Sequence, residues 1–372
     1  MRIFLIASAV LGLLVASTPA LSQSGGGLSP AIATGLGIPK LKIRGFGHAQ
    51  FQAERIDTQA EANDWENNFA NGGVDLFITS QIAEDISFLN ETIFEFGEGG
   101  ENILDVERVW LKYEYADWLQ IGIGRAHTSL GYWNQHYHHG TWLQTTTDRP
   151  IAYNFEDEGG ILPVHFVGIE ASGRVKTGVG AFSYNIAVAN GRGDIVDSVQ
   201  LVEDLNDNKA VMALVRFEPS CLPGLGFGAN AYLDEVPDNA TPGDGSLPRP
   251  STKERIFGAH LFYIYDKIEA IAEFTAILHE PEGSGARYEN YGGYALVAYQ
   301  LMPRWKPYYR WDFVDTDADD PMFFSLIEDT DRHTAGVRWD LRTFVALKIE
   351  YQYADTDSGS SHASIAQASF AF

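Results

Sequence analysis

The sequence is poor in cysteine and in basic residues, and both shortages exclude classes of protein. Cys221 is the one cysteine, so neither an intrachain disulfide nor a Cys-x-x-Cys metal or haem site can form. The chain has 26 Lys and Arg against 50 Asp and Glu, a net charge of −24, which argues against a nucleic-acid binder because phosphate neutralisation needs a basic face. The Gly-x-Ser-x-Gly and His-Glu-x-x-His motifs are also absent, so we do not expect an enzyme, although a hydrolase triad assembled in space would escape this search.

Long apolar runs are missing as well, except at the N-terminus. No stretch of eighteen apolar residues follows residue 22, so we expect no membrane-spanning helix. Arg2 precedes an apolar run over 3–15, and small residues fill most of 17–22. This pattern is typical of a secretory signal peptide, here 1–22, more than of a buried N-terminal helix. We expect the Gly- and Ser-rich segment 23–40 to be a flexible lead-in.

Segments of alternating apolar and polar residues fill the rest of the chain. In 344–353, Val345, Leu347 and Ile349 alternate with Lys348 and Glu350. Such alternation places one face of a strand on an apolar surface and the other on a polar one. Sixteen such segments lie between residues 41 and 372, beginning with 41–52 and 74–82 and ending with 344–354 and 363–372.

The connections between these segments alternate between short and long. Short links such as 116–118 and 341–343 are separated by longer ones, from 53–73 near the start to 355–362 near the end. The third long connection, 127–163, is the longest. This rhythm is typical of a transmembrane antiparallel β-barrel with short periplasmic turns and long external loops. We therefore predict an all-β barrel over 41–372, closed so that no strand edge leaves backbone groups unpaired in lipid.

Aromatic residues gather beside the short connections. Amphipathic rings prefer the headgroup level of a membrane, so this pattern predicts an interface girdle. The alternative is the aromatic core of a soluble β protein. The residues concerned are Tyr113, Tyr115, Trp118, Tyr263, Tyr265, Tyr299, Trp305 and Trp339.

The signal peptide, the amphipathic strands, the alternating connections and the C-terminal Phe372 together resemble a Gram-negative outer-membrane porin. The resemblance implies a homotrimer in outer-membrane lipid and lipopolysaccharide, with Phe372 as part of the signal read by the barrel-assembly machinery. It also implies a constriction formed by the long connection, whose Glu156, Asp157 and Glu158 are similar to the acidic, glycine-ended stretch of porin constriction loops. The residues alone leave open whether this connection lies inside the lumen or over it.

Charge placement suggests how such a barrel would select solutes. Most of the negative charge falls on the long connections, which would enrich cations at the mouth or, alternatively, bridge divalent ions on neighbouring lipopolysaccharide. Alternation points a set of basic residues away from lipid, and a basic wall opposite an acidic loop would create a transverse field across the narrowest point. The alternative is simple pairing with Glu114, Asp312, Asp340 and Glu350. The basic residues are Lys42, Arg44, Arg108, Lys112, Lys306, Arg310, Arg338 and Lys348.

Two clusters have residue types that bind metals. His136, His138 and His139 lie in the long connection, flanked by His127 and His165, and converging imidazoles bind zinc or copper. The alternative is histidines packed against Trp133 and Trp142. In 315–320, Asp315, Asp317 and Asp319 offer alternate oxygen ligands for calcium or magnesium, or else form a solvated acidic loop.

The sequence thus predicts a bacterial outer-membrane porin that admits small hydrophilic solutes and ions passively, with modest cation preference. It needs no cofactor beyond a divalent cation that the loops could bind. The alternatives are a substrate-specific channel for sugar, carboxylate or phosphate, and a plugged barrel that acts in surface binding.

Overall fold

The computed structural model describes residues 41–372 except 59–62, 97–101, 138–139, 197–203, 242–245 and 325. The predicted signal peptide, 1–22, and lead-in, 23–40, lie outside the described residues. Within the described part, no helix is long and apolar enough to cross a membrane.

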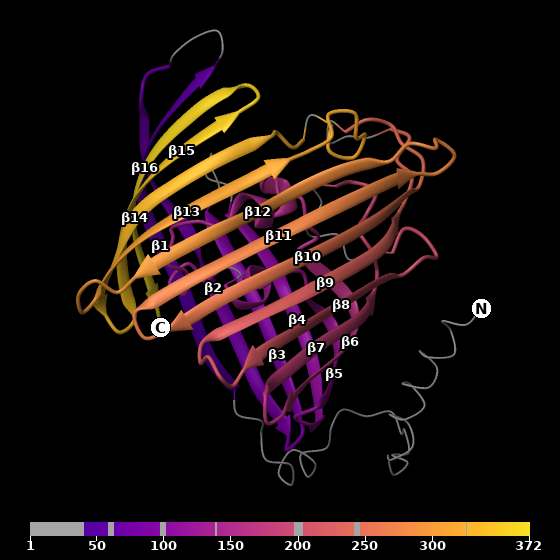
Figure 1. Cartoon of the computed structure of the whole chain (residues 1–372), viewed down its shortest axis with the longest axis horizontal. Coiled ribbons are helices and arrows are strands. Elements are labelled where there is room, and N and C mark those ends of the chain that lie inside the picture. The colour runs from indigo at the N-terminus through magenta and orange to yellow at the C-terminus, as the bar shows by residue number, and fades with distance from the viewer. Residues whose placement is uncertain are drawn as a thin grey trace, which may run out of the picture. The chain divides into compact units, whose positions relative to one another are not determined.

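The described part of the chain forms sixteen antiparallel strands that close into a barrel (Figure 1). Each strand pairs with its neighbours in sequence, and β1 pairs with β16, so every connection is a hairpin or a loop between adjacent strands. The strands are β1 (Leu41–Thr58), β2 (Glu66–Ala83), β3 (Ile86–Phe96), β4 (Asn102–Ala116), β5 (Leu119–His127), β6 (His165–Lys176), β7 (Gly180–Ala189), β8 (Ala210–Pro219), β9 (Leu225–Val236), β10 (Thr252–Tyr265), β11 (Ile268–Pro281), β12 (Tyr288–Tyr299), β13 (Trp305–Asp315), β14 (Thr330–Arg342), β15 (Val345–Thr356) and β16 (Gly359–Ala371). The predicted closed antiparallel barrel is confirmed.

The inner and outer faces of the wall differ in polarity as the alternation requires. On β15, Lys348 and Glu350 are 1% and 2% exposed on the inner side, whereas Ile349 and Tyr351 are 69% and 46% exposed on the outer side. Polar groups thus line the interior and apolar groups cover the exterior. This inverted arrangement suits a barrel whose outer face meets lipid.

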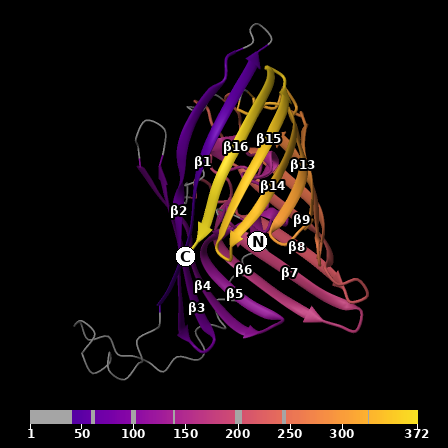
Figure 2. The ribbon, with the colours of Figure 1, turned by 90° about the vertical axis from the view of Figure 1, so that its left-hand side faces the viewer.

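The pairing of β1 with β16 closes the barrel and includes Phe372. Phe372 and Gly45 exchange two backbone hydrogen bonds of 2.9 Å, which extend the β1–β16 pairing to the chain terminus. The Phe372 ring lies over Gly45 so closely that a Cβ there would meet it at 2.3 Å, so a larger residue at this position would require the ring to move. Figure 2 shows β16 beside β1 with the C-terminus at the end of the seam.

Seven short turns of two to five residues lie at one end of the barrel, which we call the turn end. The predicted aromatic residues beside them are on the outer surface: Tyr115, Trp118 and Tyr265 are each more than half exposed. Trp305 stacks on Trp339 with ring centroids 5.1 Å apart. These rings form a belt on the outer face and not a soluble core, as predicted.

The prediction of a long connection is wrong for two segments, 53–73 and 355–362, which the structure shows to be mostly strand. The segment 53–73 is mostly strand, because β1 continues to Thr58 and β2 begins at Glu66, with Glu54 paired to Glu66. The connection 355–362 shrinks to a two-residue turn between β15 and β16. The residues of 355–362 are polar on both faces, so alternation disappears from that sequence although the backbone pairing continues. In 53–73 the exposed apolar residues Ile56 and Phe69 are too widely spaced, among polar residues and glycines, to keep the period of two.

Candidate functional site

The connection between β5 and β6, residues 128–164, is the longest in the barrel, and we call it loop L3. It contains three short helices, α3 (Trp133–His136), η2 (Ile151–Tyr153) and η3 (Glu156–Glu158). Its hydrogen bonds reach inward-facing side chains of β11, β13, β14, β15 and β16, so the loop lies inside the lumen. Figure 1 shows its magenta segments within the barrel.

Asp148 is the centre of the strongest attachment of L3. Its two carboxylate oxygens accept hydrogen bonds of 2.9 Å, one from Arg310 of β13 and the other from Arg332 of β14. Arg310 also donates to the backbone oxygens of Asp148 and Arg149. Asp312 lies behind both guanidiniums, at 2.9 and 3.6 Å. Burial alone would raise the pKa of Asp148, but the Arg332 and Arg310 charges outweigh it and hold that pKa below its usual range.

Two further cations bind the backbone of L3. Arg338 donates to the carbonyl oxygens of Trp142 and Gln144 at 2.8 and 2.6 Å. Lys348 donates to those of Thr141 and Thr146. Since a carbonyl oxygen accepts without needing a particular side chain, these anchors depend on the path of the loop more than on its sequence.

Carboxylates on the same wall bind L3 through its hydrogen-bond donors. Glu350 accepts from the backbone amide of Thr147 at 3.1 Å, and Glu269 accepts from the Thr145 hydroxyl at 2.8 Å. Lys306, another predicted inward cation, pairs with Glu269 at 3.0 Å. On the wall from β11 to β16, cations thus bind acceptors of the loop and carboxylates bind its donors.

These contacts change the role predicted for the basic wall. Arg310 and Arg338 were expected to face an acidic loop across open water, but both lie against L3 and are 0% and 8% exposed. Arg310 pairs with Asp312 and Arg338 with Asp340, as the alternative interpretation expected. These two residues therefore do not contribute to a transverse field across the lumen. They hold L3 against the wall instead.

The start of L3 is held by a buried carboxylate. Glu273 of β11 accepts hydrogen bonds from the backbone amides of Tyr132 and Trp133. Trp133 is fully buried and packs edge-on against Tyr294, whose hydroxyl also donates to Glu273 at 2.6 Å. The sequence suggests histidines packed against Trp133; in the structure Trp133 packs against tyrosines, and the His136 ring stacks on Tyr132 instead.

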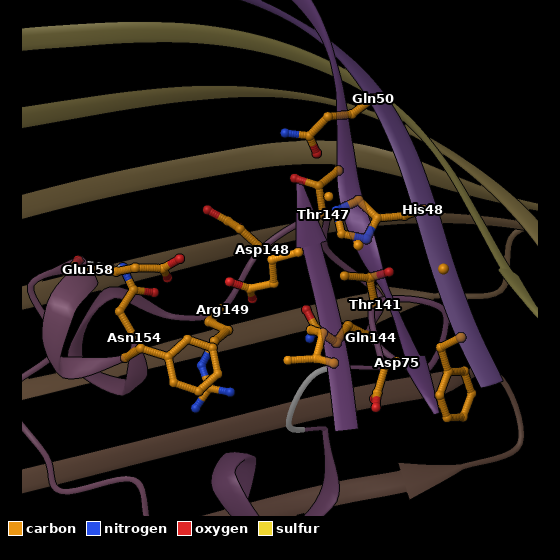
Figure 3. A pocket seen from close by; sticks show the side chains of 17 residues that line it. His48, Gln50, Asp75, Thr141, Gln144, Thr147, Asp148, Arg149, Asn154 and Glu158 are labelled. Atoms are coloured by element: carbon orange, nitrogen blue, oxygen red, sulfur yellow. Dashed lines mark hydrogen bonds between the residues drawn. The ribbon is translucent and has the colours of Figure 1, made fainter. Parts of the chain in front are cut away.

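The three acidic residues predicted to form the constriction lie in different environments. Glu156 is buried and accepts from the amide of Val164 at 2.9 Å, and burial raises its pKa to about 7. Asp157 is exposed. Glu158 lines a cavity, so it is the member of the three that faces the open part of the lumen (Figure 3).

L3 leaves two cavities open on the side of β1 to β4. The first, of about 450 Å³, lies between the loop and β1–β3, and we call it the His48 chamber (Figure 3). Its polar lining combines residues of the wall with residues of the loop: His48, Gln50, Asp75, Glu95, Thr141, Gln144, Thr147, Asp148, Arg149, Asn154 and Glu158.

The second cavity, of about 370 Å³, is the Arg44 chamber. It contains three of the predicted inward cations, Lys42, Arg44 and Arg108. Arg108 forms an ion pair with Glu91, whereas the remaining inward cation, Lys112, pairs with Glu114 outside this chamber. The lining is completed by Phe46, Phe77, Thr79, His127, Gln135, His136, Tyr137, Gly140 and Leu143.

Phe46 of β1 lines both chambers and so lies at their junction. Its ring is 5.4 Å from that of Phe77 on the wall and 6.3 Å from that of Trp142 on the loop. The aromatic contact between Phe46 and Trp142 makes this the point where L3 reaches the β1 wall. We call it the neck.

The structure describes only some of the proposed metal ligands, and it does not bring those together. His136 stacks on Tyr132 with ring centroids 3.9 Å apart, and burial together with Arg216 lowers its pKa to about 4. His138 and His139 lie outside the described residues. Asp317 accepts from the amide of Asp319. Among the residues that the structure describes, no group of three His, Cys, Asp or Glu could hold a metal ion, so the Asp315, Asp317 and Asp319 site is not formed.

Sequence reasoning missed two residues that organise this site. Arg332 shares the inward parity of Thr334 on β14, so alternation could have revealed its orientation. Asp148 stands alone among polar residues in the loop, and no local pattern distinguishes it. Its role depends on a contact across 162 residues, which a one-dimensional pattern does not contain.

Comparison with known proteins agrees on the fold. No protein-family model matches the sequence, and no curated protein matches it. Solved structures do match. An anion-selective porin from Comamonas acidovorans has a TM-score of 0.61 at 10% identity, covering 90% of this chain and all of that one. Salmonella typhi OmpF in complex with daunomycin has a TM-score of 0.60 at 12% identity, covering 90% and 98%.

A trimer form of OmpT, an outer membrane protein of Vibrio cholerae, has a TM-score of 0.57 at 10% identity, covering 89% and 99%. The low identity restricts what these likenesses show to the arrangement of the strands. The chain therefore has the sixteen-stranded fold of the outer-membrane porins.

Proposed function

We propose that this protein is an outer-membrane porin through which small hydrophilic solutes and ions diffuse down their own gradients. The observation that carries the proposal is a polar lumen, inside an apolar outer face, that L3 narrows but leaves open on the β1 side. Such a channel needs neither a cofactor nor a catalytic group. Segment 1–22 would direct export, and Phe372 would mark the chain for barrel assembly among lipid and lipopolysaccharide.

We infer that the preference for cations is modest because two regions of opposite charge act in series. The acidic loops would enrich cations at one mouth, whereas Lys42 and Arg44 lie near the turn end of β1 and repel them. Constriction occurs at the neck, where Phe46 meets Trp142. Of the acidic stretch, we assign to Glu158 alone a part in lining the path.

We infer a homotrimer from an apolar groove of about 490 Å³ on the outer face of β1, β2, β15 and β16. Ala49, Ala366 and Ala368 line it, and small side chains let a second barrel approach closely. Phe69 beside it is 86% exposed. Ala366→Trp should convert the trimer to monomer in native mass spectrometry. Ala335→Trp, on the outer face of β14, should not, and an equal effect of both would contradict this interface.

Single-channel current in a planar bilayer under a salt gradient tests the function. Steady conductance with a mildly cation-selective reversal potential is expected of the porin. Small conductance that one sugar, carboxylate or phosphate blocks would indicate a substrate-specific channel instead. Folded protein without conductance would refute the proposal in favour of a plugged barrel with a surface-binding role.

A further inference from the structure

The Arg44 chamber differs from the rest of the lumen in the balance of its charges. Its lining, taken from the described part of the chain, includes Lys42, Arg44 and Arg108 and no Asp or Glu. Glu91, directly opposite Arg108 in the β3–β4 register, neutralises it and is itself fully buried. Lys42 and Arg44 are exposed to the chamber and have no ion-pair partner among the described residues. Two positive charges therefore remain uncompensated in one concave space.

The contrast with the opposite wall shows that this is not a general property of the lumen. Arg310, Arg332 and Arg338 are each bound to carboxylates and to the backbone of L3. Their charge is taken up by the loop, so they are unavailable to a solute. Clefts lined by charge of one sign concentrate counter-ions, and of the two chambers described in the lumen the Arg44 chamber meets that condition whereas the His48 chamber, with both acidic and basic residues, does not.

Aromatic rings lie beside these free cations. Phe46 and Phe77 meet edge to face at 5.4 Å, and Arg44 is paired with Phe77 in the β1–β2 register. The Arg108 guanidinium lies 5.3 Å from the centre of the Phe77 ring. Tyr137 of L3 also lines the chamber. A planar apolar group can pack against such rings and against a guanidinium plane.

We propose that the Arg44 chamber is a binding site for small aromatic monocarboxylates, which rests on the proposed function in that the solute reaches it through the channel. Arg44 binds the carboxylate through its planar fork, and Lys42 adds a second positive charge. The aromatic ring of the solute packs between Phe77 and Tyr137. The amide of Gln135 and the hydroxyl of Thr79 line the same space and supply polar contacts at its edge.

The test measures binding directly, by isothermal titration of the full chain folded in detergent at low ionic strength. Benzoate should bind, whereas acetate, which lacks the ring, and benzamide, which lacks the charge, should each bind at least about tenfold more weakly. Equal affinity for acetate would overturn the aromatic part of the site. Equal affinity for benzamide would overturn the role of the cations.

Variants locate the site. Lys42→Gln with Arg44→Gln should weaken benzoate binding about tenfold or more. Lys176→Gln with Lys267→Gln is the matched control, since it removes the same charge from exposed positions at the turn end outside the chamber, and it should leave binding unchanged. Equal losses in both pairs would show nonspecific attraction and overturn the site.

Conductance separates this proposal from the proposed function. A channel that conducts but binds no benzoate refutes the site and leaves the porin intact. Binding by a folded protein that does not conduct supports the site and refutes the porin.

Discussion

Removing the charge of Asp148 should loosen L3 without unfolding the barrel. In Asp148→Asn the side chain keeps its size and one acceptor oxygen but loses its ion pairs with Arg310 and Arg332. Both guanidiniums keep Asp312, so neither becomes an isolated buried charge. Charged hydrogen bonds contribute about 1.5–3 kcal/mol each, and Asp148 is about one-third exposed, so we expect a local loss of about 2–3 kcal/mol.

A loss of that size raises the population of locally opened L3 by about 30- to 140-fold, since each 1.4 kcal/mol is a factor of ten. Hydrogen exchange of the peptide 141–149, measured by mass spectrometry, should accelerate by the same factor, while exchange in β13 and β14 should not change. Single-channel current should become noisier as the loop fluctuates.

Asp319→Asn is the matched control, because it removes one charge from an exposed loop residue between β13 and β14. Adding Arg332→Gln to Asp148→Asn should cost less than the sum of the two single changes, because they remove the same contact. Exchange over 141–149 as slow as in the control would refute the assignment of Asp148 as the anchor of L3.

Three further predictions follow from other residues. Burial raises the pKa of Glu156 from 4.5 to about 7, so the folded state binds the proton more tightly than the unfolded state. The stability of L3 near η3 should therefore fall, by at most ~3 kcal/mol, as pH rises from about 4.5 through about 7. Hydrogen exchange of 155–160 should show this pH dependence, and Glu156→Gln should abolish it. Phe46→Ala should widen the neck and raise single-channel conductance, whereas Phe51→Ala, on the outer face of the same strand, should not; equal conductance in the two variants would rule out a neck at Phe46. Deleting Phe372 should lower the amount of barrel in cell membranes more than the yield of refolding into detergent, and equal losses would mean that it acts only through its pairing with Gly45.

The sequence predicts the barrel well because lipid imposes a strict demand on it. Every membrane-facing position must be apolar while its neighbours face water, and that demand produces the period-two pattern seen in β15. Strand residues beyond the membrane-facing apolar band need not be apolar on their outer face. The extensions of β1 beyond residue 52 and of β2 before residue 74 are therefore invisible to the pattern, although Glu54 pairs with Glu66.

The site was less accessible to such reasoning. Parity alone indicates which way a cation points, but it does not indicate what the cation meets there. Arg44 and Arg310 have the same alternation in sequence, yet one faces an open chamber and the other is bound to Asp148. The path of L3 decides between these outcomes, and that path depends on contacts such as Glu273 with the amide of Trp133, 140 residues apart.

The anchors of L3 also order the events of assembly. The loop precedes β6, but the groups that hold it are on strands made much later: Arg310 contacts Asp148 across 162 residues, Lys348 contacts Thr146 across 202, and Gln367 contacts Thr147 across 220. Since such distant contacts require loop closure first, L3 cannot settle until the C-terminal strands have taken their places. The anchors that fix L3 inside the lumen therefore form late in assembly, so the channel takes its final width only when the barrel wall is nearly complete.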